Sequence, residues 1–219
     1  MPISDLVTSV AQVRAFDSGS EICKATGFWY ELEDKLFFIT NRHVVVDESE
    51  NHSPDELRLL LHTDSGDVRR NNDYLIPLYS NGKPSWREHP VHGPDVDVVA
   101  IPVDKSEVEG IFFIKPLGPA NHIPKDVEVP IGADVQVIGY PLGFHDEVHN
   151  LPIIRNATIA SVYPVPFGGK PYILVDARLH SGTSGSPVMT KPTTNVTHSD
   201  GSVSMHNVAV SFFVGIHSA

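Results

Sequence analysis

Short apolar segments alternate with turn-forming residues over most of the 219-residue chain. The segments are rich in β-branched and aromatic residues, which favour strands, and Gly, Pro, Asn and Asp separate them. No long amphipathic helix and no repeat of fixed period interrupts this pattern. The chain is therefore predicted to be all-β, a barrel or a sandwich. The predicted strands are residues 26–30, 36–40, 56–63, 97–103, 133–140, 153–162, 172–176 and 208–217.

Three further stretches organise these strands. Asn81-Gly82, between residues 75–79 and 84–86, is a strong signal for a tight hairpin. Residues 104–128 carry turn residues with little periodicity, which is typical of a connection between two halves. Residues 191–207 are rich in Thr, Ser, Asn and Gly and are predicted to form a mobile loop. We expect two β-units, residues 1–110 and 111–219, that together form one domain.

Composition and charge narrow the class of protein. Hydrophobic residues make up 41% of the chain, enough for a soluble protein with a core, and the net charge of −11 disfavours nucleic-acid and anionic-membrane partners. Cys23 is the single cysteine, which excludes an internal disulfide and favours a reducing compartment. The first residues show no signal peptide, and the most apolar run, 208–216, is too short to span a bilayer. We therefore expect a cytoplasmic protein with no membrane partner.

Residues 180–188, His-Ser-Gly-Thr-Ser-Gly-Ser-Pro-Val, are the first candidate for chemistry. Gly182 before Ser184 allows a turn in which consecutive N–H groups point into one concavity. Such a concavity can hold a developing oxyanion while the serine oxygen attacks. The alternative is a Gly/Ser turn between two strands, and only a base with an orienting acid distinguishes the two interpretations.

His43 and Asp97 are the candidates for that base and acid. His43 ends an aromatic, β-branched segment, whereas many of the twelve histidines lie in polar stretches. A half-buried histidine bonded to a backbone carbonyl is the structural alternative. Asp97 opens an apolar segment, where an unpaired carboxylate is costly to desolvate, and Asp95 is its competitor. The chain order His, Asp, Ser is one of the known orders of a catalytic triad.

Three blocks in this order resemble the signatures of chymotrypsin-fold (trypsin-like) serine peptidases. They are Ile-Thr-Asn-Arg-His-Val at residues 39–44, Asp-Val-Val-Ala at 97–100 and Gly-Thr-Ser-Gly-Ser-Pro at 182–187. Residues 175–187 and 137–144 resemble the corresponding segments of bacterial, disulfide-free HtrA-type proteases. Val-Gly-Ile-His at 214–217 resembles glutamyl endopeptidases. The resemblance extends from about Thr26 to Ala219.

The resemblance implies two antiparallel six-stranded β-barrels with the active site in the cleft between them. His43 and Asp97 would come from the first barrel and Ser184 from the second. The backbone N–H groups of Gly182 and Ser184 would form the oxyanion hole. The implied activity is that of a serine endopeptidase on a polypeptide substrate, with neither a metal nor an organic cofactor.

The same resemblance suggests a specificity pocket. His217, with help from Ser218, would bind a P1 glutamate or glutamine side chain. Leu179 stands where glutamyl endopeptidases place a hydroxyl residue, and His180 either rims the pocket or lies in an exposed loop. A buried His217 bonded to a neighbouring strand is the structural alternative.

His145 and His149 have the i, i+4 spacing of a helical zinc site. They follow Pro-Leu-Gly-Phe, which predicts a loop, so no metal site is expected there.

A catalytically silent or partner-activated protease-like module of a larger cytoplasmic assembly is the rival interpretation. The chain lacks an Ile-Val-Gly-Gly-like start, so activation by a new N-terminus is not expected. The family usually continues past the strand that contains residue 217 into another strand or helix. A regulatory domain or partner beyond the C-terminus is therefore an expectation.

Overall fold

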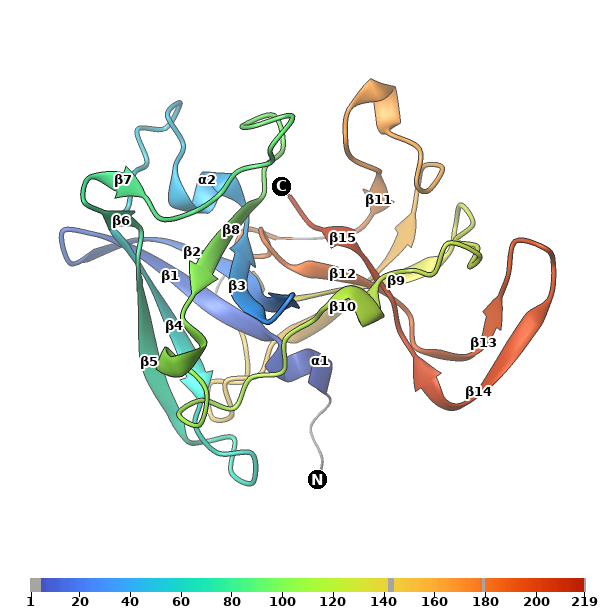
Figure 1. Cartoon of the computed structure of the whole chain (residues 1–219), viewed down its shortest axis with the longest axis horizontal. Helices are drawn as coiled ribbons and strands as arrows, with labels where there is room; N and C mark the ends of the chain where they lie inside the picture. The colour runs from blue at the N-terminus through green and yellow to red at the C-terminus, as the bar shows by residue number, and fades with distance from the viewer. Residues whose placement is uncertain (1–4, 142–143, 179, 219) are drawn as a thin grey trace.

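Two curled antiparallel sheets make up most of the structure, a computed structural model (Figure 1). It describes residues 5–141, 144–178 and 180–218. Helix is confined to short segments, and no described helix is long and apolar enough to cross a membrane. The prediction of an all-β chain with two antiparallel, barrel-like units is confirmed.

The first sheet has six strands in the order β5-β4-β1-β2-β3-β8. Short helical segments flank two of its strands: α1 (Asp5–Thr8) precedes β1, and α2 (Arg42–Val45) follows β3. The strands are β1 (Val10–Asp17), β2 (Ser20–Leu32), β3 (Lys35–Thr40), β4 (Glu56–His62), β5 (Asn71–Pro77) and β8 (Val99–Val103).

Alternation of side chains builds the core of this sheet. Along β3, every second residue is buried, and Leu57, Leu59 and Ile101 point into the same cluster from β4 and β8. Trp29 and Phe38 meet edge to face inside it, with ring centroids 5.1 Å apart. The pattern of period two is therefore what fixes the register of the sheet.

The second sheet has five strands, in the order β11-β10-β9-β12-β15, where the resemblance implied six. Val135, Val137, Ile159 and Val188 form its core. The outermost strands of this sheet are β11 and β15, and Phe213 of β15 also forms an isolated bridge to His122. Its strands are β9 (Asp134–Gly139), β10 (Ile153–Ile159), β11 (Val175–Asp176), β12 (Pro187–Thr190) and β15 (Phe213–Ile216).

The predicted mobile loop at residues 191–207 is wrong. The segment forms most of a two-stranded hairpin, β13 (Thr193–Thr197) and β14 (Val203–Val210), which projects from the second sheet (Figure 1). Its β-branched threonines and valines suit an extended backbone, and Gly201, with φ +82°, makes the turn. The polar composition reflects solvent exposure of the hairpin.

Of the other local elements, some were predicted from the sequence and others were missed. Asn81 and Gly82, with φ of 51° and 71°, link β6 (Tyr79–Ser80) to β7 (Lys83–Pro84), which confirms the predicted tight hairpin. Residues 104–128 connect the two sheets through two 3-10 turns, Lys105–Glu107 and Pro119–Asn121. The sequence did not predict β1, nor the helical turn α2 after β3.

Thr26, on β2, links the two sheets. Its N–H donates to the Ser184 carbonyl (2.9 Å) and its hydroxyl to the Gly182 carbonyl (2.8 Å). The same hydroxyl accepts the Tyr140 N–H (3.0 Å), and the Thr26 carbonyl accepts the Thr40 hydroxyl (2.8 Å). Thr26 is fully buried, so without its hydroxyl the Gly182 carbonyl and the Tyr140 N–H would lose their partner inside the protein.

We expect Thr26→Val to lower the free energy of unfolding by about 1–3 kcal/mol, because the Tyr140 N–H and the Gly182 carbonyl lose their partner inside the protein. Thr26→Ser keeps the hydroxyl and should restore most of that stability. Urea denaturation of the two variants beside the wild type measures the difference. Equal stability of the valine and serine variants would show that these hydrogen bonds do not hold the sheets together.

Candidate active site

His43 lies on α2, the single helical turn that follows β3. Val44 and Val45 are fully buried beside it and fix this turn against the first core. The His43 side chain remains 31% exposed, at the margin of the sheet. A short turn packed by two valines therefore presents the imidazole at the surface.

Asp97 holds His43 through both of its carboxylate oxygens. Oδ2 lies 2.7 Å from His43 Nδ1, and Oδ1 accepts the His43 backbone N–H at 2.9 Å. Asn41 donates its side-chain amide to the Asp97 carbonyl at 2.5 Å, which steadies the loop before β8. Because an ionised carboxylate only accepts, Nδ1 carries the proton and Nε2 is left as the basic nitrogen. Asp95 makes no hydrogen bond to His43, so Asp97 is the partner in this geometry.

The environment of Asp97 favours its ionised form. Partial burial raises the pKa of the carboxyl group, but hydrogen bonds from the His43 side chain, the Ser218 hydroxyl and the His43 N–H outweigh burial. The net result is an Asp97 pKa below its ordinary value. The Ser218 hydroxyl donates to Asp97 Oδ2, and its predicted assistance to His217 in a substrate pocket stays a prediction.

Ser184 lies on a tight turn before β12 and is 8% exposed. Gly185, with φ +85°, closes the turn, and a Cβ there would collide with the Thr26 carbonyl and the Thr40 hydroxyl. Hydrogen bonds from Gly185 N–H to the His217 carbonyl (3.0 Å) and from Ser186 N–H to the Thr183 carbonyl (3.0 Å) hold the turn. Within the described residues, neither the Gly182 N–H nor the Ser184 N–H donates a hydrogen bond, as an oxyanion hole requires.

Thr26 places the serine turn against the His43 segment. Its N–H holds the Ser184 carbonyl, and its own carbonyl accepts the hydroxyl of Thr40, three residues before His43. The hydrogen bonds of the described residues do not include one between His43 and Ser184. The serine turn and the segment before His43 are thus linked through Thr26, without a hydrogen bond between the His43 and Ser184 side chains.

His217 follows β15, beside a cavity of about 490 Å³ that Asp97 and Ser218 also line. Burial, with a smaller contribution from the charge of His43, lowers the pKa of His217. Its Nε2 atom is buried and has no hydrogen-bond partner among the described residues. Binding of a P1 side chain by His217 stays a prediction.

The other two residues predicted to form the pocket are His180 and Leu179. His180 is exposed, its carbonyl accepts the Thr183 hydroxyl (2.7 Å), and it is not among the residues that line the His217 cavity. Leu179 lies outside the described residues.

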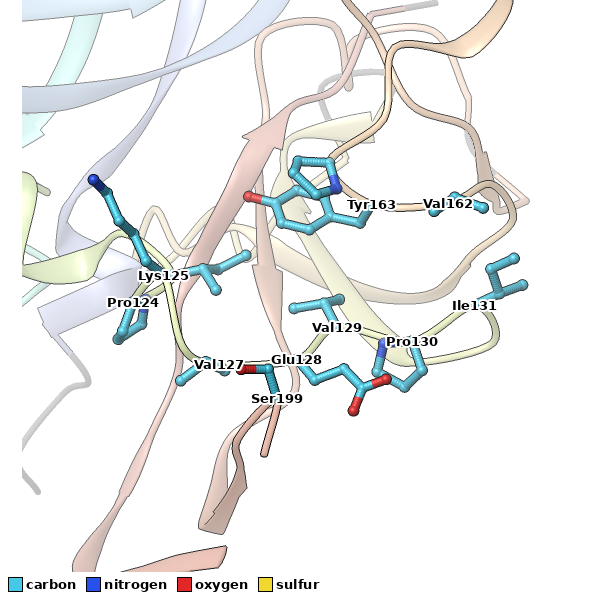
Figure 2. Close-up of a pocket in the computed structure, with 12 residues that line it drawn as sticks. Pro124, Lys125, Val127, Glu128, Val129, Pro130, Ile131, Val162, Tyr163 and Ser199 are labelled. Carbon is cyan, nitrogen blue, oxygen red and sulfur yellow. The ribbon is translucent and has the colours of Figure 1, made fainter. Parts of the chain in front are cut away.

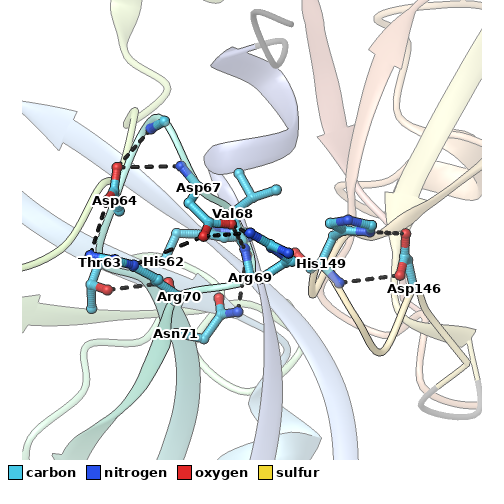
Figure 3. Close-up of polar contacts among 11 residues, drawn as sticks. His62, Thr63, Asp64, Asp67, Val68, Arg69, Arg70, Asn71, Asp146 and His149 are labelled. Atoms are coloured by element: carbon cyan, nitrogen blue, oxygen red, sulfur yellow. Dashed lines mark hydrogen bonds and ion pairs between the residues drawn. The ribbon is translucent and has the colours of Figure 1, made fainter.

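His149 takes part in contacts between the two sheets. Its Nδ1 lies 2.8 Å from Asp146 Oδ2, and its carbonyl lies 2.9 Å from His62 Nε2 of the first sheet (Figure 3). His145 packs against the Tyr140 ring in the same loop. Across residues 5–141, 144–178 and 180–218, no group of three His, Cys, Asp or Glu side chains is placed to hold a metal ion.

A second Asp-His-Ser series lies at the β13–β14 hairpin, where the sequence predicted only polar loop histidines. His198 Nδ1 is 3.1 Å from Asp126 Oδ2, and its Nε2 is 2.9 Å from the Ser204 hydroxyl. His206 Nε2 approaches the same hydroxyl at 3.4 Å. Any assay of serine reactivity must therefore separate Ser204 from Ser184.

A larger cavity, of about 620 Å³, lies between residues 123–131 and the turn at 162–164 (Figure 2). Ser199 from the β13–β14 hairpin completes its wall. None of the predicted site residues lines it. Volume alone therefore does not identify the candidate site in this fold.

Comparisons with known proteins agree with this fold. The sequence profile of the trypsin-like peptidase domain matches residues 25–196, while no curated protein matches the chain. A serine endoprotease from Yersinia pestis has the same fold, with 15% identity and a TM-score of 0.53 over 87% of this chain and 54% of that one. Deg5 is similar at 14% identity and a TM-score of 0.53, over 84% of this chain and 75% of that one.

The described chain thus spans about half the length of the Yersinia endoprotease. At these identities the solved structures show the fold, whereas the profile match covers most of the chain. The chain belongs to the family of trypsin-like peptidase domains.

Proposed function

We propose that the chain is a serine endopeptidase that hydrolyses peptide bonds through Ser184, His43 and Asp97. The observation that carries the proposal is the pair of hydrogen bonds between His43 and the Asp97 carboxylate, at 2.7 Å from the ring and 2.9 Å from the backbone N–H. This arrangement fixes both the orientation of the imidazole and its tautomer, and leaves Nε2 as a general base.

The reaction follows from these positions. Ser184 Oγ attacks the substrate carbonyl carbon while His43 Nε2 takes the hydroxyl proton, and the N–H groups of Gly182 and Ser184 stabilise the oxyanion. The tetrahedral intermediate collapses as His43 gives that proton to the leaving amine, which leaves an acyl-enzyme. Water, deprotonated by His43, then attacks the ester, and the acid product leaves as Ser184 regains its proton. Asp97 stabilises the imidazolium in both halves.

The proposal requires His43 and Ser184 to approach each other when substrate binds. Catalytic hydrogen bonds commonly tighten only in the substrate complex, so their absence in the free chain is compatible with catalysis. The absence of a hydrogen bond between His43 and Ser184 also favours the alternative, a protease-like module that is silent until a partner acts on it. The two functions differ in whether Ser184 of the isolated chain reacts with an active-site probe.

A fluorophosphonate probe should label Ser184 of the folded protein. We expect Ser184→Ala to abolish labelling and Ser204→Ala to leave it unchanged, because only Ser184 adjoins the unpaired N–H groups that stabilise the phosphonyl oxygen. Peptide mapping by mass spectrometry assigns the modified serine.

Labelling of Ser204 in the wild type would assign the reactivity to the hairpin instead. Absence of labelling in a protein shown to be folded by circular dichroism would favour the silent or partner-activated module.

We further propose that His217 selects substrates with a glutamine or glutamate side chain at P1. Its buried Nε2 lacks a partner among the described residues, and a side-chain oxygen of the substrate would supply one. The lowered pKa means that the imidazole is neutral at pH 7 and donates a hydrogen bond without a charge. A carboxylate gains from the protonated form, whereas an amide does not.

This gives a pH dependence with a definite sign. As the pH falls below 6.5 and through the lowered pKa of His217, the ratio of kcat/KM for P1 Glu to that for P1 Gln should rise by about fivefold to tenfold. Taking this ratio cancels every pH effect that the two substrates share. In His217→Gln the ratio should not depend on pH in this range. A preference for P1 Val, Ala or Arg in a peptide library would exclude the proposed selectivity.

A further inference from the structure

Two histidines and a serine share one face of the β13–β14 hairpin. Ser204 and His206 are two residues apart on β14, so their side chains point to the same face. His198 follows the end of β13, and its N–H donates to the carbonyl of Ser202, just before β14, at 2.9 Å. In Figure 1 the hairpin projects from the second sheet on the side away from α2, which carries His43. These residues are therefore separate from the candidate active site.

The imidazoles of His198 and His206 converge on one hydroxyl group. Ser204 Oγ lies 2.9 Å from His198 Nε2 and 3.4 Å from His206 Nε2. A hydroxyl group carries one hydrogen, so it can donate to only one of the two nitrogens. A metal ion, in contrast, can accept a lone pair from both, because each neutral imidazole offers one.

Asp126 holds the His198 ring from its other side. Asp126 Oδ2 lies 3.1 Å from His198 Nδ1. Since an ionised carboxylate only accepts, Nδ1 carries the proton and the lone pair is on Nε2, the atom that faces Ser204. A carboxylate on the remote nitrogen of a metal-binding histidine fixes the ring and strengthens the ligand. Asp126 is itself held to the hairpin, because its carbonyl accepts the Ser199 N–H at 2.8 Å.

The hairpin face is supported by buried residues and is open to solvent. Val196, which pairs with Ser204 across the hairpin, is 4% exposed, and Val127 forms a bridge to His198. The His198 side chain is 22% exposed, and His206 is exposed. An ion can thus reach both rings from solvent, while the backbone beneath them is already ordered and adds little entropic cost to binding.

The donor atoms favour a metal such as zinc. Imidazole nitrogens suit Zn²⁺, Cu²⁺ and Ni²⁺, whereas Mg²⁺ and Ca²⁺ prefer oxygen ligands. Zinc is usually four-coordinate, and two histidines leave two positions for a hydroxyl group or water. Within residues 5–141, 144–178 and 180–218, no third His, Cys, Asp or Glu side chain is placed to complete the set. Such a two-histidine site binds zinc less tightly than a closed structural site with four protein ligands.

We propose that His198 and His206 bind a zinc ion through their Nε2 atoms, with Asp126 orienting His198. The Ser204 hydroxyl gives up its contacts with the two nitrogens when the metal takes their lone pairs. The ion joins the end of β13 to β14, and through Asp126 it also ties the hairpin to the segment that connects the two sheets. No residue of the proposed triad takes part, so the site is tested independently of the proposed peptidase activity.

Zinc chloride titrated into metal-free protein is the probe, and proton–nitrogen NMR spectra of the histidine rings are the readout. We expect the Nε2 resonances of His198 and His206 to shift together and to saturate at one zinc per chain. His89 and His92, whose ring centroids are 5.0 Å apart, are the internal control. His89 Nδ1 accepts the N–H groups of Val91 and His92, and no carboxylate of the described residues orients this pair. These two rings should therefore respond only at a higher zinc concentration.

Substitutions separate the ligands from the orienting residue. His198→Gln and His206→Gln should each abolish saturation at one equivalent, because a single imidazole holds zinc weakly. Asp126→Asn keeps the size of the side chain and should weaken zinc binding by about tenfold or more, as measured by titration calorimetry. His92→Gln, which removes a histidine from another exposed loop, should leave the affinity unchanged. Circular dichroism without zinc checks that each variant is folded.

The proposal is overturned if the His198 and His206 rings do not shift at a zinc concentration that shifts those of His89 and His92. A shift of His198 without His206 would also exclude a two-histidine site, as would equal losses of affinity in His92→Gln and His206→Gln. Equal affinity of Asp126→Asn and the wild type would overturn the orienting role of Asp126.

Discussion

One buried threonine connects the two halves of this protein. Thr26 uses its N–H, carbonyl and hydroxyl to join the serine turn, Thr40 and Tyr140 in one hydrogen-bonded set. Because every group involved is removed from water, losing a hydrogen-bond partner costs much free energy, and the groups are held in a narrow range of positions. The serine turn therefore has its position set by the first sheet, although its residues belong to the second. Chemistry that needs groups from both sheets depends on this contact.

Asp97 concentrates the electrostatics of the site. It accepts hydrogen bonds from the His43 ring, the His43 backbone N–H and the Ser218 hydroxyl, and these bonds stabilise its negative charge although it is partly buried. The same contacts that keep it ionised keep the imidazole in one orientation. The pKa of nearby His217 is lowered, because burial and the charge of His43 both disfavour its protonated, charged form. The two histidines thus differ in their hydrogen-bonding partners and burial, which is why different roles are proposed for them.

β15 connects the core of the second sheet to the candidate site. It pairs with β12 along one side, and its Phe213 forms an isolated bridge to His122. Ser218, two residues after its end, donates to Asp97. The Asp97 carboxylate is therefore held by contacts from both halves of the chain, since His43 follows a strand of the first sheet.

The sequence by itself determined the β-class, most strand positions and the candidate residues His43, Asp97 and Ser184, because β-branched runs, turn dipeptides and short signature blocks are local properties. It placed Asp97 with His43, which the structure joins by two hydrogen bonds. It missed β1, α2 and the hydrogen bond from Ser218 to Asp97, and mistook the β13–β14 hairpin for a loop. Only tertiary structure decided these points, since they depend on which distant segments pair and which groups are buried together.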